Sequence, residues 1–220
     1  MAVRTTAAVA LVAALLLPGA GTAQELPGRM STVLLMGALT PKKAVFATGV
    51  ILTAGKSLTI VTAAHITPYV PLTIFTMRGE ILQAHSVRTV PNHDMALIES
   101  SPVALSYPVP PTAAVAPATG GRLYVWGFDA EPAPIELDAS MLFPAIDMPE
   151  QNGSPRIGIA CSKCGHGDSG AGVFAQDGSL IGIVTSGWYD HNGAQVFVEA
   201  EPIGVLDTLR TVACGSTGDR

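Results

Sequence analysis

Short apolar runs separated by glycine, proline, lysine or asparagine make up most of the chain after residue 30. Valine, isoleucine and threonine are dense in these runs, and no long helical period appears, so we expect the runs to be strands. The predicted strands cover residues 31–39, 44–53, 58–62, 72–77, 80–90, 94–98, 122–128, 134–142, 156–160, 172–175, 180–185 and 195–200. Residues 202–213 place apolar side chains near helical spacing and predict a short closing helix. The pattern as a whole predicts an all-β protein.

A proline-rich stretch divides the predicted strands into two sets. Five prolines punctuate residues 102–121, which end at Gly120-Gly121. Proline lacks a backbone donor and is disfavoured inside sheets, so this stretch is predicted to be an extended connector. The residues after position 23 are numerous enough for one large all-β unit or for two small subdomains.

The first 23 residues have the features of a signal peptide. Arg4 precedes an apolar run over residues 7–17, and small residues lead to Ala23, after which we expect cleavage. The alternative of a membrane anchor is disfavoured because the run is shorter than the roughly 20 residues that span a bilayer. We therefore expect an exported protein, periplasmic or extracellular, with no membrane association in its mature form.

Composition argues for a folded protein, and charge argues against nucleic acid as its partner. Charged residues make up 13% of the chain and hydrophobic residues 48%, which argues against disorder. The formal net charge is −5, and no basic cluster is present. Nucleic acid is therefore not an expected partner.

The chain has three cysteines, Cys161, Cys164 and Cys214. An odd number leaves at least one thiol unpaired or paired between chains, and spacing alone allows Cys161–Cys164 or a bridge from either to Cys214. A redox site would need a βαβ context that the pattern lacks, and a zinc site that adds His166 is equally disfavoured. No metal or cofactor is expected.

The segment with the most chemical character covers residues 165–174, Gly-His-Gly-Asp-Ser-Gly-Ala-Gly-Val-Phe. Glycines permit a sharp bend that holds the hydroxyl of Ser169 out toward a substrate. The backbone N–H groups of Gly167 and Ser169 are candidates to stabilise an oxyanion beside that hydroxyl. A serine hydroxyl is a weak nucleophile near neutral pH, so it needs a base and the base needs an orienting acid.

Two upstream segments offer that base and acid. Residues 61–65 read Val-Thr-Ala-Ala-His and end at His65, and residues 94–97 read Asp-Met-Ala-Leu and begin at Asp94. With the Gly-Asp-Ser-Gly segment at Ser169, the chain resembles the trypsin-like (chymotrypsin-fold) serine peptidases, compact bacterial members in particular. The order His, Asp, Ser is that family's order, and other triad hydrolases use different orders.

The resemblance implies a fold and a domain organisation. It implies two six-stranded antiparallel Greek-key barrels with the active site between them, followed by the short C-terminal helix. Residues 1–23 are then the signal peptide, 24–107 the N-terminal barrel with His65 and Asp94, 108–121 the connector, and 122–220 the C-terminal barrel with Ser169. The resemblance also favours a disulfide close to the serine loop.

Carried over from the family, Ser169 is the nucleophile, His65 the general base and Asp94 the residue that orients the imidazole. His93 precedes Asp94, and because adjacent residues of a strand point to opposite faces, we expect it to be structural. His166 has two interpretations, a place on the leaving-group side of the cleft or simple solvation, and the second is favoured.

Asp168, just before the serine, raises the question of activation. In relatives activated by cleavage this aspartate pairs with a new α-amino group, but the chain has no activation site of the Arg-Ile-Val-Gly-Gly type. We expect either an internal donor or cation for Asp168, or a plan without a zymogen, and we favour the second.

The resemblance also places the primary substrate pocket. Its walls would be residues 162–166 and Thr185-Ser186-Gly187, and its back residues 195–198. Lys163, if it pointed inward, would favour acidic side chains. No aspartate occupies the position that gives trypsin its preference for Arg and Lys.

The function expected from these observations is that of a monomeric, exported serine endopeptidase that cleaves polypeptides through an acyl-enzyme. Two alternatives stay open: a non-catalytic binding module on the same fold, or an esterase with the same triad. Binding modules of this kind usually lose a triad residue, and the chain lacks the Gly-x-Ser-x-Gly elbow of the α/β-hydrolases.

Overall fold

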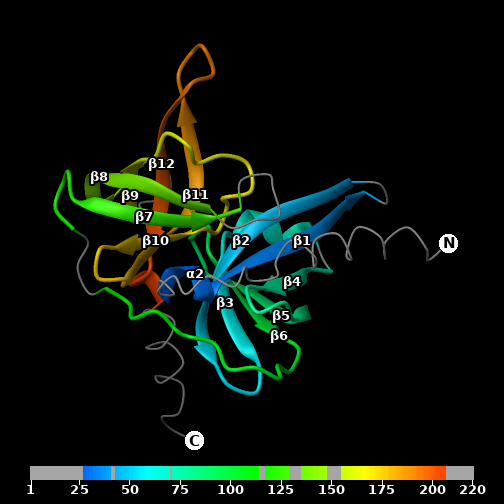
Figure 1. Ribbon diagram of the computed structural model, residues 1–220. Helices are drawn as coiled ribbons and strands as arrows, with labels where there is room; N and C mark the ends of the chain where they lie inside the picture. The colour runs from blue at the N-terminus through cyan, green and yellow to red at the C-terminus, as the bar shows by residue number, and fades with distance from the viewer. Residues whose placement is uncertain are drawn as a thin grey trace, which may run out of the picture.

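Two closed barrels of six antiparallel strands each make up the structure (Figure 1). The structure, a computed structural model, describes residues 27–40, 43–69, 71–113, 117–128, 135–147 and 155–206. In each barrel the strand order is 1-2-3-6-5-4 when its strands are counted along the chain, so the two barrels share one topology. The predicted all-β, two-barrel fold is confirmed.

The first barrel follows a short helix and contains a 3₁₀ helix between its third and fourth strands. Its elements are α2 (Pro27–Ser31), β1 (Thr32–Thr40), β2 (Lys43–Ala54), β3 (Leu58–Thr62), η1 (Ala64–Tyr69), β4 (Thr73–Thr76), β5 (Ile81–Thr89) and β6 (Ala96–Ser100). β-Branched and leucine side chains from these strands fill the barrel, among them Val33, Ile51, Ile60, Ile74 and Ile98. Such residues suit strands because their stiff side chains pack well on a pleated surface.

The second barrel holds the remaining strands, β7 (Arg122–Gly127), β8 (Ile135–Asp147), β9 (Pro155–Ala160), β10 (Gly172–Ala175), β11 (Leu180–Tyr189) and β12 (Gln195–Pro202). Its core is a separate cluster that includes Leu123, Val125, Ile159 and Val173. The β11–β12 hairpin extends well beyond the barrel wall, at the top of Figure 1.

A third apolar cluster joins the two barrels. Val50 and Val61 of the first barrel pack with Phe174 and Ile183 of the second, together with the buried ring of Trp126. Burial of apolar surface is the dominant favourable term in association, so this cluster fixes the barrels against each other. The two barrels that carry the predicted catalytic residues are therefore held together by an apolar cluster.

Several predicted boundaries move in the structure. β8 and β11 run to Asp147 and Tyr189, past the predicted ends at 142 and 185, and β6 begins at Ala96 instead of residue 94. β11 continues because Trp188 stacks on Phe197 of β12. The predicted signal peptide and Cys214 lie outside the described residues, as does the predicted helix beyond residue 206, so these stay predictions together with the domain boundaries.

Candidate active site

Three loops at one end of the strands carry the predicted catalytic side chains. His65 lies in η1, directly after β3, and Asp94 lies in the turn before β6. Because β3 and β6 are antiparallel neighbours, with Thr62 opposite Ala96, the end of one strand lies beside the start of the other. Ser169 lies in the loop before β10 of the second barrel. The predicted residues are therefore brought together from both barrels.

A continuous chain of hydrogen bonds links the three side chains. His65 Nδ1 lies 2.7 Å from Asp94 Oδ2, and His65 Nε2 lies 2.9 Å from Ser169 Oγ. The other carboxylate oxygen of Asp94 accepts the backbone N–H of His65 at 2.8 Å. When Nδ1–H donates to the carboxylate, Nε2 is left unprotonated and accepts from the serine hydroxyl. This arrangement suits proton abstraction from Ser169.

The loop of Ser169 is bound directly to the first barrel. The carbonyl of Ser169 accepts the N–H of Thr48 at 2.8 Å, and the hydroxyl of Thr48 donates to the carbonyl of Gly167 at 2.9 Å. On the other side, Gly170 N–H donates to the carbonyl of Val184 at 2.7 Å. Gly170 has a φ of +86°, a conformation that only glycine adopts readily. The serine is thus fixed by strands of both barrels.

Two backbone N–H groups of this segment donate to carbonyls within it. The N–H of Asp168 donates to the carbonyl of Gly165, and the N–H of Ala171 donates to the carbonyl of Asp168. Gly167 has a φ of +108°, again in the glycine region. The role of the Gly167 and Ser169 N–H groups as oxyanion donors stays a prediction.

Asp168 is buried, with 1% of its surface exposed, and its carboxylate accepts a hydrogen bond from the same loop. Its Oδ2 accepts the N–H of Gly165 at 2.8 Å. A Cβ added to Gly127 would lie only 2.0 Å from Asp168 Oδ1, so the missing side chain of Gly127 leaves space for the carboxylate. The N–H of Gly165 is thus an internal donor to Asp168, and the favoured plan without a zymogen stays a prediction.

A cavity of about 220 Å³ lies beside Ser169. Thr185, Ser186 and Gly187, the predicted pocket residues, line it. The rest of its lining consists of Cys164, Gly165, His166, Asp168, Ser169, Val184, Tyr189, Gln195 and Val198. Lys163 is exposed and is not among these residues, so the cavity gives no support for a preference for acidic side chains.

Tyr189 is a lining residue that the sequence did not indicate. A Cβ on Gly187 would lie 3.2 Å from Tyr189 Oη, so the ring covers the open face of Gly187. Its position depends on the extension of β11 past residue 185, which the sequence pattern did not show.

His166 and His93 have different surroundings. His166 is exposed and lines both the first cavity and a second cavity of about 330 Å³ that His65 and Ser169 also line, so its role stays a prediction. His93 Nδ1 lies 2.7 Å from Glu201 Oε2 and is structural as expected. The reason differs from the predicted one, because residues 92–94 form a turn, with Asn92 at a φ of 63°, and not a strand.

Cys161 and Cys164 form a disulfide next to the cavity. Both residues are buried, and the bridge closes the loop that leads to Gly165. In the part of the chain that the structure describes, no group of three or more His, Cys, Asp or Glu side chains is arranged to hold a metal ion. Within that same part, no helix has the length and apolar character to span a membrane.

Known structures of proteases share this fold. The active form of the Rv3671c protease from M. tuberculosis aligns with a TM-score of 0.67 and 19% sequence identity, over 82% of this chain and 79% of that chain. The HtrA-type protease AlgW, solved with a tripeptide, aligns with a TM-score of 0.70 and 18% identity, over 84% of this chain and 61% of that chain. At this level of identity the likeness shows the fold alone.

The sequence itself matches one family model. No curated protein matches the sequence. The model of the trypsin-like peptidase domain matches residues 47–183, which include His65, Asp94 and Ser169. The chain therefore belongs to the family of trypsin-like peptidase domains.

Proposed function

We propose that the protein is a serine endopeptidase that cleaves polypeptides through an acyl-enzyme intermediate. The observation that carries the proposal is the unbroken hydrogen-bonded chain from Asp94 through His65 to Ser169. Each member has the partner that nucleophilic catalysis requires, a base on the hydroxyl and a carboxylate on the base. Membership of a peptidase family and the protease neighbours support peptides as the substrate class.

In the proposed reaction, Ser169 Oγ attacks the scissile carbonyl carbon as its proton passes to His65 Nε2. The tetrahedral intermediate then collapses, and the imidazolium gives the proton to the leaving amine. A water molecule then gives a proton to His65 and attacks the acyl carbon, and the ester bond to Ser169 Oγ breaks, which releases the acid product and restores the serine hydroxyl. Asp94 holds the imidazole in the correct tautomer and stabilises its charged form throughout. No step needs a metal or a cofactor.

The oxyanion of the intermediate is proposed to lie against the N–H groups of Gly167 and Ser169. Hydrogen bonds from Thr48 to Gly167 and Ser169 support this role because they hold the loop rigid before substrate arrives. Donors fixed in advance need no reorganisation during the reaction.

The substrate side chain next to the scissile bond is proposed to enter the cavity lined by Thr185, Ser186 and Gly187. No lysine or arginine is among the cavity's lining residues, and its one carboxylate, Asp168, accepts a backbone N–H. The lining therefore offers no cation to an acidic side chain, and its carboxylate already accepts a backbone N–H, so uncharged side chains are favoured because burying an unpaired charge is costly. We expect preference for small or medium-sized uncharged residues at this position.

The setting of the activity is also part of the proposal. The apolar run before Ala23 supports export by a signal peptide, with the mature enzyme acting as a monomer in a periplasm or outside the cell. N-terminal sequencing of the protein recovered from its native host would give Gln24 as the first residue.

A library of internally quenched peptides tests the proposed function. The wild-type protein should cleave peptides, whereas Ser169→Ala and His65→Ala should each reduce kcat by on the order of 10⁶-fold. Ser86→Ala, which changes an exposed serine on β5, is the matched control and should cleave like the wild type. Cleavage that persists in Ser169→Ala would refute the assignment, and a wild type that binds peptides without cleaving them would point to a binding module.

A further inference from the structure

A buried group of charged side chains lies behind Asp94 and has no part in the triad. Glu201 of β12 is fully buried, and Arg156 of β9 has 6% of its surface exposed. The Arg156 guanidinium contacts Glu201 Oε1, and His93 Nδ1 lies 2.7 Å from Oε2. Burying a carboxylate costs free energy unless it is paired and hydrogen-bonded, so we asked which contacts of Glu201 offset this cost.

The third donor to Glu201 is the backbone of Asp94 itself. The N–H of Asp94 donates to Glu201 Oε1 at 2.6 Å. Both carboxylate oxygens of Asp94 accept from His65, one from the ring and one from the backbone. Asp94 is therefore held from two sides, by His65 in front and by Glu201 behind.

The turn that carries Asp94 benefits from such support. Asn92, two residues earlier, has a φ of 63°, in the left-handed region that most side chains avoid. Glu201 contacts this turn at both His93 and Asp94.

Glu201 also joins the acid to the barrel that carries the nucleophile. It lies opposite Ile183 in the β11–β12 pair, and the next residue, Val184, accepts the N–H of Gly170 beside Ser169. The turn of Asp94 and the loop of Ser169 are thus anchored on one pair of strands. Movement of either relative to the other would lengthen the hydrogen bonds to His65.

We propose that Glu201 is a positioning residue, which holds Asp94, and through it His65, in register with Ser169, with Arg156 as its counter-ion. This inference rests on the proposed peptidase function. It concerns geometry at the reacting atoms, so it predicts a loss of turnover and not of substrate affinity.

The decisive variant is the double substitution Glu201→Leu with Arg156→Met. Replacing a buried ion pair by apolar residues of similar volume is often neutral for stability, so we expect the variant to fold. Asp94 N–H then loses its acceptor, and kcat per folded molecule should fall by about 10²-fold, the scale of a small misplacement of catalytic groups. KM should change by less than about twofold, because substrate contacts are untouched.

Three further variants make the test specific. Glu201→Gln keeps an oxygen at the Oε1 position and should retain kcat within about threefold, because the bond from Asp94 is preserved. Glu201→Asp keeps the charge but withdraws the acceptor, and should lower kcat about tenfold. Tyr107→Phe disturbs a buried polar group of the first barrel that contacts Thr76 and Glu80, and should leave kcat unchanged.

The outcomes separate this inference from the proposed function. Loss of kcat in the double variant with recovery in Glu201→Gln supports the inference. Wild-type kcat in the folded double variant would overturn it while leaving the peptidase intact. If the double variant does not fold, Glu201→Asp decides: a lowered kcat supports the inference, and wild-type kcat overturns it. A wild type without activity would instead refute the proposed function, and this inference with it.

Discussion

The loop of Ser169 shows how a single residue type determines the site. Gly170 combines a φ of +86° with close contacts, since a Cβ there would lie 2.0 Å from the Thr48 carbonyl oxygen and 2.2 Å from Thr62 Oγ1. Any other residue would have to adopt an unfavourable backbone conformation and displace a strand of the first barrel. The hydrogen bonds that fix Ser169 would be displaced with it.

We predict that Gly170→Ala lowers the free energy of unfolding by about 3 kcal/mol, from backbone strain and crowding together. Gly79→Ala is the matched control, because Gly79 also has a positive φ, +81°, but has no atom within 4 Å of the added Cβ. That variant should lose only about 1 kcal/mol. Urea unfolding of both variants measures the difference, and equal losses would contradict the crowding argument.

A second residue-scale prediction concerns Asp94. Asp94→Asn keeps the size of the side chain but lets an amide face His65 Nδ1, which favours the wrong tautomer of the ring. We expect kcat to fall on the order of 10⁴-fold, the loss associated with the equivalent change in triad enzymes. Steady-state kinetics with a cleaved peptide would show it. Turnover close to that of the wild type would mean that the bond between His65 and Asp94 is not needed.

The sequence predicted the residues that lie in compact motifs and missed those that depend on strand register. His65, Asp94 and Ser169 each follow or precede a distinctive local pattern, and the structure brings them within hydrogen-bond distance. Glu201 and Tyr189 have no such pattern around them. Their contacts depend on which residues of β12 face the turn at His93 and Asp94 and on how far β11 extends.

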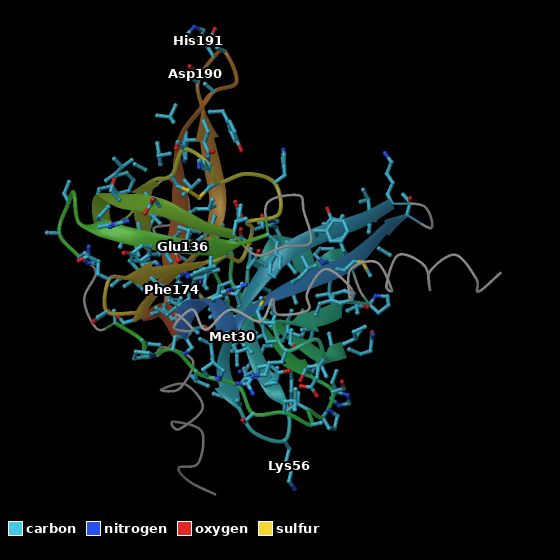
Figure 2. The ribbon with its side chains drawn as sticks, viewed as in Figure 1. Met30, Lys56, Glu136, Phe174, Asp190 and His191 are labelled. Atoms are coloured by element: carbon cyan, nitrogen blue, oxygen red, sulfur yellow. A yellow bond between two sulfur atoms is a disulfide. The ribbon has the colours of Figure 1, made fainter. Side chains whose placement is uncertain are left out.

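At the scale of elements, the β11–β12 hairpin is the feature that departs most from prediction. Its outer part includes Trp188, which stacks on Phe197, and Phe197 meets Phe143 of β8 edge to face. Figure 2 shows Asp190 and His191 at its tip. Alternation of apolar residues ends near residue 185, so the pattern gave no sign of this extension. Aromatic pairs across strands, and not burial in a core, stabilise it.

The tip of the hairpin should respond to pH through Asp190. Its Oδ1 accepts the N–H groups of Asn192 and Ala194, both at 2.8 Å. The bond from Ala194 is the main reason that the pKa of Asp190 lies below its ordinary value of 3.8. Because the folded pKa is depressed, the stabilisation is present above the unfolded pKa and is lost as pH falls through the folded one.

We therefore expect amide exchange at Asn192 and Ala194 to accelerate, relative to intrinsic rates, as pH falls below about 4. Asp190→Asn, which has no carboxylate to titrate, should not show this acceleration. Hydrogen exchange followed by NMR measures both. The same pH dependence in the two proteins would rule out Asp190 as its source.

In the whole molecule, two barrels with the same topology meet at apolar clusters and at several polar links. The links nearest the candidate site are Thr48 to Gly167 and Ser169, and Glu201 to His93 and Asp94. The two-barrel architecture could be expected from the resemblance that the family motifs carry. The links could not, because each joins residues more than one hundred positions apart.

A pH-dependent property of the first barrel is separate from catalysis. Tyr107, on the segment after β6, is packed in the barrel core, and its hydroxyl donates to Glu80. Burial, followed by this hydrogen bond, raises the pKa of Tyr107 from 10.0 to about 12. The unfolded chain ionises at lower pH than the folded one, so the stabilisation is complete below the unfolded pKa and is lost as pH rises from 10 toward 12.

We predict that the melting temperature of the wild type falls more steeply than that of Tyr107→Phe between pH 10 and 12. The other tyrosines titrate in both proteins, so the difference between the two curves isolates Tyr107. Calorimetry at a series of pH values gives the curves. Parallel curves over this range would show that Tyr107 ionises as freely in the folded protein as in the unfolded chain.

The proposed reaction requires that Ser169 is a nucleophile activated by His65. Labelling with a fluorophosphonate probe, followed by mass spectrometry of the labelled peptide, tests it most directly, because the probe reacts with an activated serine and not with ordinary hydroxyl groups. We expect one adduct, on Ser169, that is lost in Ser169→Ala and forms much more slowly in His65→Ala. An adduct on another serine, or labelling of Ser169 at an unchanged rate without His65, would contradict it.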